Sequence, residues 1–589
     1  MSRRGFLRLA GATVGMGLLA ACSPQQPAPP AATSAPAKPA EAAKPTEAAK
    51  PADTAKPTTA PAAAAKPTEA AKPAEAAKPA EAAKPAAAGP APTAANTLTF
   101  LWGGDTDKLD PPAMTAQEGF IATTAMYEGL VKYKTNSTDI EPSLAEKWDV
   151  SPDGLSYVFH LRGGVKFHDG SPLTAEAVAF SFDRSINKEN PLFKEAQGAG
   201  GFPYIDTYIG NAVAKVEAVG ALDVKFTLKK KYSPLLSNLA IPPGYIISME
   251  ALKKLGSKIN ENPVGTGPFK FTEWKKDDHI TVDMFPDYWG PKAKIARIVF
   301  QPVPEAAVRA LKIQKGEGDV AWPFDPKDTA NLKGKADTDV LEQAGLNVNM
   351  AEFNLKKPEF QNKSLRQALN YAVNKQELCD KLYSGAAVPS VGGLPPTSWA
   401  FDKELKGYPY DPDKAKALLK EAGYSGSVIP INTYTIPRGY NPQGQKLAEA
   451  VQQYFEGVGV KSEIKTTEWT QYRKDRRAGE HFLSFGGWQA DTGDPENFLG
   501  VFFHSSNMGA TNTAFYNVPE VDKLLDQANE ETDVAKRKTL FNQAERRAVD
   551  DAPWLFISHA KQQVAINKRV KGFELQPTYF YFFNNVSLG

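Results

Sequence analysis

The run Tyr157-Val-Phe-His-Leu161 lies at the centre of the most informative part of this chain, residues 143–184. Its apolar and polar residues alternate, and a period of two residues predicts a strand with one buried face. The same alternation appears in Lys215-Val-Glu-Ala-Val-Gly-Ala-Leu-Asp-Val-Lys-Phe-Thr-Leu228, where turn residues from Gly220 to Asp223 predict a hairpin. Ile280-Thr-Val-Asp-Met284 predicts a further strand. This part of the chain is therefore expected to be rich in strands.

Helical patterns are equally clear in the second half of the chain. Leu365, Ala368, Leu369, Ala372 and Val373 have the spacing that places them on one face of a helix. Further helices are predicted between the N-cap Asp411 and Gly423, from about 443 to 455, and twice within 521–550 with a break near Thr532. A buried strand is expected over Trp554-Leu-Phe-Ile-Ser558. The predicted fold class is α/β with mixed sheets.

The amino terminus carries the pattern of an export signal. Arg3 and Arg4 precede an apolar run of about 13 residues, whereas roughly 20 are needed to cross the hydrocarbon core of a membrane. Paired arginines before such a run are typical of the twin-arginine export route, and Leu19-Ala20-Ala21-Cys22 suits a lipoprotein signal peptidase. We therefore expect residues 1–22 to be a twin-arginine lipoprotein signal. Lipidated Cys22 would anchor the exported chain to the outer face of the cell membrane, in a periplasm or on a cell surface.

Residues 23–96 consist almost wholly of Ala, Pro, Lys, Glu and Thr. Units such as Glu41-Ala-Ala-Lys-Pro45-Thr and Glu69-Ala-Ala-Lys-Pro73-Ala recur, and each proline arrives before a helix could complete two turns. Such a segment cannot bury a core, so a disordered tether is expected, reaching between ~50 Å as a coil and ~200 Å if extended.

Charge and cysteine content limit the partners of the chain. Removal of residues 1–21 takes away three arginines, which lowers Lys+Arg from 69 to 66 against 67 Asp+Glu. A nucleic-acid-binding surface would normally show as an excess of basic residues, so no nucleic acid is expected as a partner.

With Cys22 lipidated, Cys379 has no disulfide partner, and its helical setting predicts a buried thiol. Residues 96–589 number 494, which is too many for one hydrophobic core, so two or three domains are expected.

Motifs of catalysis and metal binding are missing. The six histidines never fall at metal-ligand spacing, and neither a Gly-x-Ser-x-Gly elbow nor a phosphate-binding loop ending in Gly-Lys-Ser/Thr is present. Gly265-Thr-Gly267-Pro-Phe269 is followed by a strand pattern, so it is predicted to be a turn and not a nucleotide site. A binding protein without metal or cofactor is therefore favoured over an enzyme. An anchored hydrolase and a receptor that reports ligand to a chemosensor remain the alternatives.

A series of ordered blocks carries a resemblance to a known family. They are Ser143-Leu-Ala-Glu-Lys-Trp148, Ser151-Pro-Asp-Gly154, Tyr157-Val-Phe-His-Leu-Arg162, Gly164-Val-Lys-Phe-His-Asp169-Gly, Thr174-Ala-Glu-Ala-Val178, Ser181-Phe-Asp-Arg184, Asn262-Pro-Val-Gly-Thr-Gly-Pro-Phe269, Asp287-Tyr-Trp-Gly290, Arg366-Gln-Ala-Leu, Ala372-Val-Asn-Lys375, Tyr410-Asp-Pro-Asp-Lys-Ala-Lys-Ala-Leu-Leu-Lys-Glu-Ala-Gly423 and Asp494-Pro-Glu-Asn-Phe498. Together they resemble the family 5 extracellular solute-binding proteins, which are peptide and nickel receptors of ABC importers. Within that family the resemblance is to the dipeptide receptors.

The resemblance implies four ligand-binding residues. Ile436-Pro-Arg438-Gly-Tyr440-Asn-Pro442 is similar to the segment whose arginine holds the ligand carboxylate, and Gly487-Trp488-Gln-Ala-Asp491 to the segment whose aspartate holds the ligand ammonium. An arginine can donate two parallel hydrogen bonds to a carboxylate, and an aspartate only accepts. Tyr440 and Trp488 are expected either in the core or in the wall of the cleft. Asp494 precedes Pro495 and is expected to cap a helix.

The family also implies a two-lobed periplasmic-binding-protein fold of the large peptide-receptor type. Residues 97–345 and 565–589 would form lobe I, 350–562 lobe II, with crossings near Leu346-Asn-Val-Asn-Met350 and Val564-Ala-Ile566. Ligand would draw the lobes together by hinge rotation, with residues 103–109 closing over it, and a membrane permease would receive the closed monomer. Longer peptides, haem, a nickel chelate and an oligosaccharide remain alternative ligands.

Overall fold

The computed structural model describes residues 93–589 except 199, 325 and 437. The predicted signal, Cys22 and the tether up to residue 92 lie outside the described residues. The tether was expected to extend to residue 96, yet Ala94–Asn96 form a 3₁₀ turn that leads into the first strand. Asn96 is held there because its carbonyl accepts the backbone NH of Ala296 at 2.9 Å.

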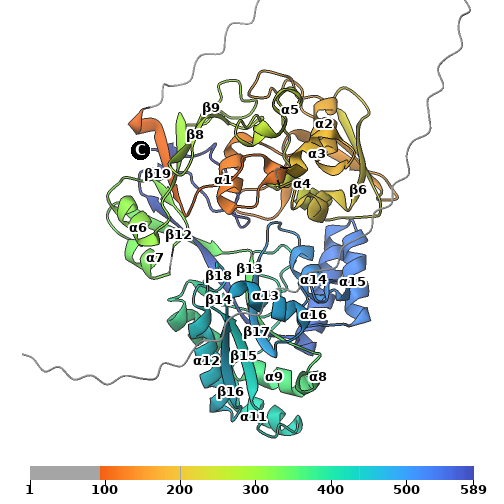
Figure 1. Ribbon diagram of the computed structural model, residues 1–589, viewed down its shortest axis with the longest axis vertical. Helices are drawn as coiled ribbons and strands as arrows, with labels where there is room; N and C mark the ends of the chain where they lie inside the picture. Colours follow the sequence, from red (N-terminus) through yellow and green to blue (C-terminus); the bar gives the residue numbers. More distant parts are fainter. Residues whose placement is uncertain (1–92, 199, 325, 437) are drawn as a thin grey trace, which may run out of the picture. The chain divides into compact units, whose positions relative to one another are not determined.

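One mixed sheet of 12 strands, counted over the described residues, dominates the fold (Figure 1). Its order is β16-β15-β17-β13-β18-β11-β1-β10-β9-β8, and both β12 and β14 pair with β18. The strands, in chain order, are β1 Thr97–Trp102, β8 Phe269–Lys275, β9 His279–Met284, β10 Arg297–Pro302, β11 Val320–Ala321, β12 Thr338–Ala344, β13 Asn347–Phe353, β14 Ala387–Pro389, β15 Ile429–Tyr434, β16 Ser462–Thr467, β17 Leu483–Gln489 and β18 Trp554–Asn567.

The smaller sheets include the predicted hairpin. A four-stranded sheet has the order β4 (Ala145–Val150), β5 (Ser156–Leu161), β7 (Asp223–Leu228), β6 (Val213–Ala218). Val216 lies opposite Phe226, as the alternation predicted, and Phe226 packs edge-on against Phe182 of α2 (Ala175–Ile186). Two further pairs are β2 (Val131–Tyr133) with β3 (Ile140–Pro142), and β19 (Val570–Lys571) with β20 (Ser587–Leu588).

The helices predicted over 365–373, 411–423, 443–455 and 521–550 are all present, whereas most of the other helices were not predicted from the sequence. The α-helices are α1 Gln117–Met126, α3 Pro191–Gly198, α4 Leu235–Leu239, α5 Met249–Leu255, α6 Ala306–Gln314, α7 Pro326–Leu332, α8 Pro358–Gln361, α9 Lys363–Tyr371, α10 Lys375–Glu377, α11 Pro412–Glu421, α12 Gly444–Gly457, α13 Trp469–Ala478, α14 Glu496–Phe503, α15 Pro519–Glu530 and α16 Val534–Asp551. Short 3₁₀ turns are η2 Pro111–Ala113, η4 Pro242–Gly244, η5 Gly256–Asn260 and η7 Ser505–Asn507, and the π turns are η3 Asp206–Gly210 and η6 Leu378–Leu382. Asp411 caps α11 by accepting the Lys414 NH at 2.9 Å, and Cys379 is buried within η6, both as predicted.

The long strand β18 links the two halves of the large sheet. Leu555 lies opposite Ala351 of β13, whereas Val564 lies opposite Leu341 of β12, and β14 pairs between them at His559. Only residues 554–558 were predicted as strand. The pattern ends there because the next residues are polar. They continue the ladder by pairing with β12, and side-chain bonds such as that from Gln563 to Glu342, at 2.5 Å, add to this pairing. The predicted lobe boundaries and crossings stay a prediction.

The first part of β18 is covered on both faces, as its continuous apolar run predicted. Leu555 and Ile557 pack in one hydrophobic cluster with residues of α9, α11 and α12, while Trp554 and Phe556 pack in another with residues of α14, α15 and α16. This arrangement fixes the neighbouring strands β13 and β17, and the end of β17 leads into the candidate site.

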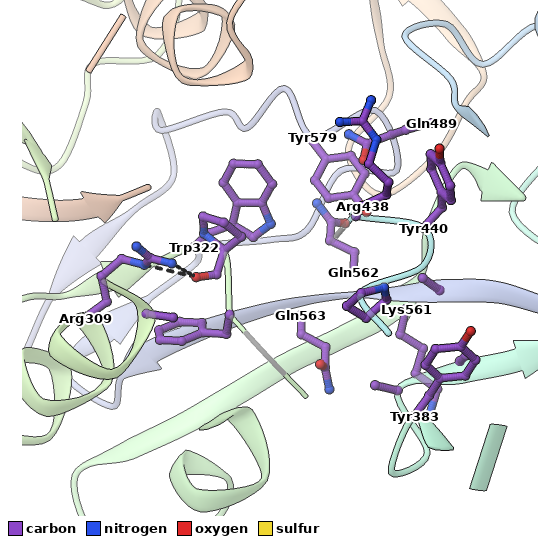
Figure 2. Close-up of a pocket in the computed structure, with 18 residues that line it drawn as sticks. Arg309, Trp322, Tyr383, Arg438, Tyr440, Gln489, Lys561, Gln562, Gln563 and Tyr579 are labelled. Atoms are coloured by element: carbon purple, nitrogen blue, oxygen red, sulfur yellow. Dashed lines mark hydrogen bonds between the residues drawn. The ribbon is translucent and has the colours of Figure 1, made fainter. Parts of the chain in front are cut away.

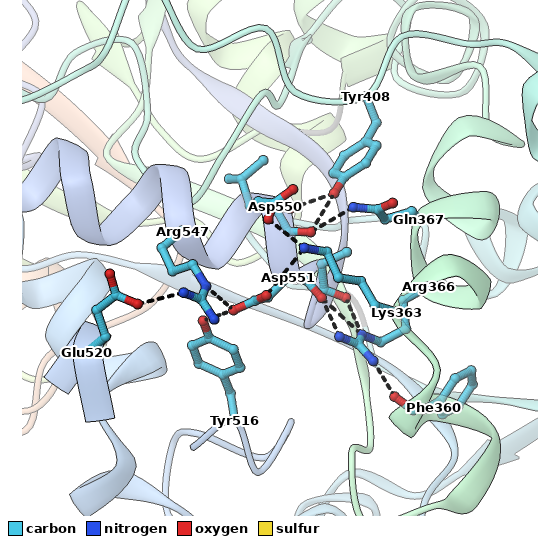
Figure 3. Close-up of polar contacts among 12 residues, drawn as sticks. Phe360, Lys363, Arg366, Gln367, Tyr408, Tyr516, Glu520, Arg547, Asp550 and Asp551 are labelled. Atoms are coloured by element: carbon cyan, nitrogen blue, oxygen red, sulfur yellow. Dashed lines mark hydrogen bonds and ion pairs between the residues drawn. The ribbon is translucent and has the colours of Figure 1, made fainter. Parts of the chain in front are cut away.

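Arg366 explains why one of the family blocks contains an arginine (Figure 3). Its guanidinium donates to the carbonyls of Phe360 and Ala552, at 2.5 and 3.1 Å, and also to that of Asp551. The bonds to Asp551 and Ala552 satisfy carbonyls at the carboxyl end of α16 that have no helical partner, and the bond to Phe360 joins α8 to them. The Asp551 carboxylate in turn accepts Tyr516 and Arg547, each at 2.8 Å. Arg366 therefore acts in folding and joins α9 to the end of α16.

No helix within the described part of the chain is long and apolar enough to cross a membrane.

Candidate ligand-binding site

A cavity of about 260 Å³ lies beside Arg438 (Figure 2). Its wall combines aromatic side chains with amides and cations, among them Trp322, Tyr383, Tyr579, Gln562, Lys561 and Arg309. In Figure 2 Arg438, Tyr440 and Gln489 lie together on one side of this cavity, and Arg309 and Trp322 on the other. We call it the β18 cavity because Ala560–Gln563 of β18 form part of its wall.

A second cavity, of about 440 Å³, shares Arg438, Tyr440 and Gln489 with the first. Its other walls include Trp488 at the end of β17, Tyr204 just before η3, and the helix α13. We call it the α13 cavity. Arg438 therefore stands between two cavities and can reach a ligand in either.

The backbone around Arg438 is fixed by its own short turn. Arg438 and Asn441 exchange two backbone hydrogen bonds, at 3.1 and 2.9 Å, and the buried side chain of Asn441 bonds to Tyr383 and Tyr434 at 3.1 and 3.2 Å. The half-buried guanidinium lies over the ring of Trp469, 4.0 Å from its centroid. Among the described residues, no carboxylate lies within 4.0 Å of this guanidinium. Its charge is therefore available to an anionic ligand.

Tyr440 and Gly487 fit together closely. A Cβ atom at Gly487 would lie 2.2 Å from Cδ2 of Tyr440, so only glycine lets this ring pack flat against β17. Trp488, the next residue, donates from Nε1 to Asn497 at 3.0 Å and packs edge-on against Phe502. Both predicted aromatic residues thus line a cavity, and Trp488 also belongs to the packing around α14.

Asp491 follows β17, as predicted, but it lines neither cavity. Its carboxylate accepts a hydrogen bond from the hydroxyl of Tyr208 in η3. Burial raises the pKa of Asp491 above its usual range, and the bond from Tyr208 partly opposes that rise. Tyr204, a wall residue of the α13 cavity, packs against Tyr208, with ring centroids 6.3 Å apart. Asp491 is thus separated from the α13 cavity by two tyrosines.

Asp494 plays the structural role expected of it, with an addition. It accepts the backbone NH of Glu496 at 3.1 Å in the first turn of α14, as predicted for a cap. It also forms a buried two-bond ion pair with Arg537 of α16, at 2.9 and 3.0 Å. No spacing in the sequence predicts the second contact, because Arg537 is 43 residues away.

The electrostatic character of both cavities is positive. No aspartate or glutamate is found among the residues that line them, within the part of the chain that the structure describes. The cationic wall residues are Arg309, Arg438 and Lys561 of the β18 cavity and Arg438, Arg473, Arg476 and Arg477 of the α13 cavity. Attraction for anionic groups is therefore stronger here than for cations.

Sequence reasoning missed the contribution of α13. Trp469, Arg473, Arg476 and Arg477 all line its cavity, and they recur at i, i+4, i+7 and i+8, the spacing of one helix face. That spacing is visible in the sequence and could have been noticed. Residues 103–109, which were expected to close over a ligand, line neither cavity; Asp105 is instead bonded to Trp274 at 3.1 Å.

Among the described residues, no three or more His, Cys, Asp or Glu side chains are grouped so that they could hold a metal ion. Within the segment predicted to be a turn, residues 266–268 form a bend and Phe269 begins β8; Gly267 donates to the carbonyl of Met126 at 2.9 Å.

Comparison with known proteins places the chain in a family. The profile of the bacterial extracellular solute-binding proteins, family 5 (middle), matches residues 139–510. The dipeptide-binding protein of Escherichia coli is 37% identical over 514 residues, which cover 85% of this chain and 96% of that protein. Heme-binding protein A of Haemophilus influenzae is 37% identical over 476 residues, 79% of this chain and 87% of that protein.

Solved structures agree with the sequence relatives. The ABC transporter-associated periplasmic binding protein DppA of Helicobacter pylori, solved in complex with the peptide STSA, is 32% identical and superimposes with a TM-score of 0.68. The match covers 84% of this chain and 98% of that structure, which confirms the predicted periplasmic-binding-protein fold. This chain belongs to family 5 of the bacterial extracellular solute-binding proteins.

Proposed function

We propose that this protein captures short peptides, dipeptides foremost, outside the cytoplasm and delivers them to the permease of an ABC importer. The observation that carries the proposal is the guanidinium of Arg438, which stands between two cavities and has no carboxylate within 4.0 Å among the described residues. An arginine in that position suits a ligand carboxylate, because its planar fork donates two parallel hydrogen bonds. The dipeptide-binding relative and the peptide complex of DppA support this ligand class.

Asp491 is the proposed partner of the ligand ammonium. Its carboxylate is buried and is bonded to one hydroxyl donor, Tyr208, so it retains capacity to accept further hydrogen bonds. A small rearrangement of Tyr204 and Tyr208 would bring an ammonium in the α13 cavity into reach of Asp491. Clamping both ends of a zwitterion would make the site selective for peptide length, while the roomy walls would tolerate different side chains.

Closure by hinge rotation would enclose such a ligand between two lobes. Residues 97–345 with 565–589 form the proposed first lobe and 350–562 the second, and both proposed charge partners lie in the second. Contacts already join the two groups of residues: Gly493 donates to the Tyr133 hydroxyl, and Ser233 to the carbonyl of Asn529, each at 2.8 Å. The closed form, as a monomer without catalytic activity, would be the species that a permease binds.

Export and anchoring belong to the same proposal. Arg3, Arg4 and Cys22 would send the chain through the twin-arginine route and attach it to lipid. Replacing Cys22 with alanine should release the protein from the membrane fraction of expressing cells, whereas replacing Arg3 and Arg4 with lysine should retain it in the cytoplasm. Unchanged membrane association of the Cys22→Ala protein would remove the lipid anchor from the proposal.

Haem is the second candidate ligand, because the haem-binding relative is as similar as the dipeptide-binding one. Isothermal titration of the purified protein with a dipeptide, a tripeptide, a pentapeptide and haemin separates these candidates. Micromolar binding that is strongest for the dipeptide supports the proposal. Equal binding of the pentapeptide, or binding of haemin without any peptide, would reassign the ligand.

A further inference from the structure

The helix α13 presents one charged face to the candidate site. Trp469, Arg473, Arg476 and Arg477 lie along this face and all line the α13 cavity. Lys474 of the same helix is not among the residues that line it. The cavity thus receives three guanidinium groups from one helix, in addition to that of Arg438.

One of these arginines is already neutralised. The largely buried guanidinium of Arg476 forms an ion pair with the buried Glu352 and donates to the hydroxyl of Thr513 at 2.8 Å. This contact anchors α13 to β13 and leaves Arg476 without excess charge.

Arg473 and Arg477 differ from Arg476. Both are exposed, and neither has a carboxylate within 4.0 Å among the described residues. The ring of Trp469 lies 6.0 Å from the guanidinium carbon of Arg473 and 4.0 Å from that of Arg438. Two guanidinium groups with no carboxylate partner thus border the same tryptophan, close enough for one ligand to contact both.

We infer that the α13 cavity is a subsite for a second carboxylate of the ligand, which places peptides with an acidic carboxyl-terminal residue among the preferred ligands. The inference rests on the proposed function, in which Arg438 holds the main-chain carboxylate. The side-chain carboxylate of the same carboxyl-terminal residue would then face Arg473 and Arg477. Each guanidinium can donate a charge-assisted pair of hydrogen bonds to it. An amide of the same size gains neither the charge nor the two-acceptor geometry. A cationic side chain is repelled beside Arg473 and Arg477, whereas the ligand ammonium is proposed to lie at the Tyr204 wall, towards Asp491.

Exposed arginines are commonly solvated and contribute little, so the test must isolate their charge. Titration of the full-length protein with Ala-Glu, Ala-Gln and Ala-Lys does so, since the first two differ in charge at equal size. The inference predicts that Ala-Glu binds at least about tenfold more tightly than Ala-Gln at low salt, that Ala-Lys binds most weakly, and that added salt reduces the difference.

Variants assign the effect to this helix. In the double variant Arg473→Gln with Arg477→Gln the ratio of Ala-Glu to Ala-Gln affinity should fall to about one, whereas Lys474→Gln, an exposed cation on the same helix, should preserve it. Circular dichroism and a thermal melt of each variant show whether it is folded.

The outcomes separate the two proposals. If Ala-Gln binds but Ala-Glu shows no advantage, or if the advantage survives in the double variant, the subsite is wrong and the proposed peptide function stands. If none of the three dipeptides binds to the parent protein, the proposed function is wrong and the subsite is lost with it.

Discussion

The hydroxyl of Tyr208 donates a hydrogen bond to the carboxylate of Asp491, which connects η3 to the residues that follow β17. This contact makes the ionisation of Asp491 depend on a residue 283 positions away in the sequence. Burial raises the pKa of Asp491, and the bond from Tyr208 holds it lower than burial alone would.

Peptide affinity should therefore depend on pH through Asp491. Only the ionised carboxylate attracts an ammonium, so affinity should be full above the raised pKa and should fall about tenfold for each pH unit below it. In Tyr208→Phe the pKa rises further, and the loss of affinity should begin at a higher pH. Titration calorimetry of a dipeptide between pH 7 and pH 4 measures both profiles. An affinity that stays constant over this range, or the same profile in Tyr208→Phe, would contradict the role given to Asp491.

The contact of Tyr440 with Gly487 gives a second prediction. Gly487→Ala would place a Cβ atom 2.2 Å from the Tyr440 ring and force that ring away from β17. We expect a loss of about 1–3 kcal/mol in the free energy of unfolding together with weaker peptide binding, because Tyr440 lines both cavities. Thermal melts and titration calorimetry measure the two effects.

Gly457→Ala is the matched control. A Cβ atom there would meet nothing within 4 Å, and the residue ends the helix α12. This change should leave binding intact and keep stability equal or slightly higher. An effect of Gly487→Ala no larger than that of Gly457→Ala would show that the ring of Tyr440 moves freely.

A buried carboxyl on α16 predicts how stability changes with pH. Glu545 accepts the backbone NH of Leu394 at 2.8 Å, and burial raises its pKa from 4.5 to about 7. The Glu545 carboxyl holds its proton more tightly in the folded state than in the unfolded state. The free energy of unfolding therefore falls as pH rises from 4.5 through 7.

Glu545→Gln removes this ionisation. The variant should be more stable than the parent at pH 8, by an amount on the order of 1–3 kcal/mol, and should lose that advantage at pH 5. Urea unfolding at the two pH values measures the difference, with the exposed Glu456→Gln as control. Equal stability of parent and variant at pH 8 would mean that Glu545 ionises in the fold without cost.

The sequence predicted regular elements well where one physical signal acted alone. The alternation of 215–228 and the cap at Asp411 both gave elements at the expected places. It failed for the second half of β18, because the polar residues Lys561 to Gln563 are stabilised by partners far along the chain and not by an apolar pattern. Local patterns cannot indicate such partners.

The candidate site was only partly predictable for the same reason. The sequence identified Arg438, Tyr440 and Trp488, and the structure brings all three to one cavity. It did not indicate that the hydroxyl of Tyr208 would bond to the carboxylate of Asp491, or that Glu352 would form an ion pair with Arg476. Both contacts join segments that are far apart in the sequence. The arginine face of α13 was visible as a helical spacing, but its meaning depends on Arg438 lying against Trp469.

The most direct test of the central claim, that Arg438 binds the ligand carboxylate, is a double cycle of titrations. The free dipeptide Ala-Gln and its carboxyl-terminal amide are each titrated into the parent protein and into Arg438→Ala. Loss of one partner of a charge pair that is enclosed with its ligand costs about 2–5 kcal/mol, so the parent should bind the amide at least about 30-fold more weakly than the free peptide. In Arg438→Ala the two ligands should bind with nearly equal, weak affinity. If the parent binds the amide as tightly as the free dipeptide, or if Arg438→Ala still distinguishes them, Arg438 does not hold the carboxylate.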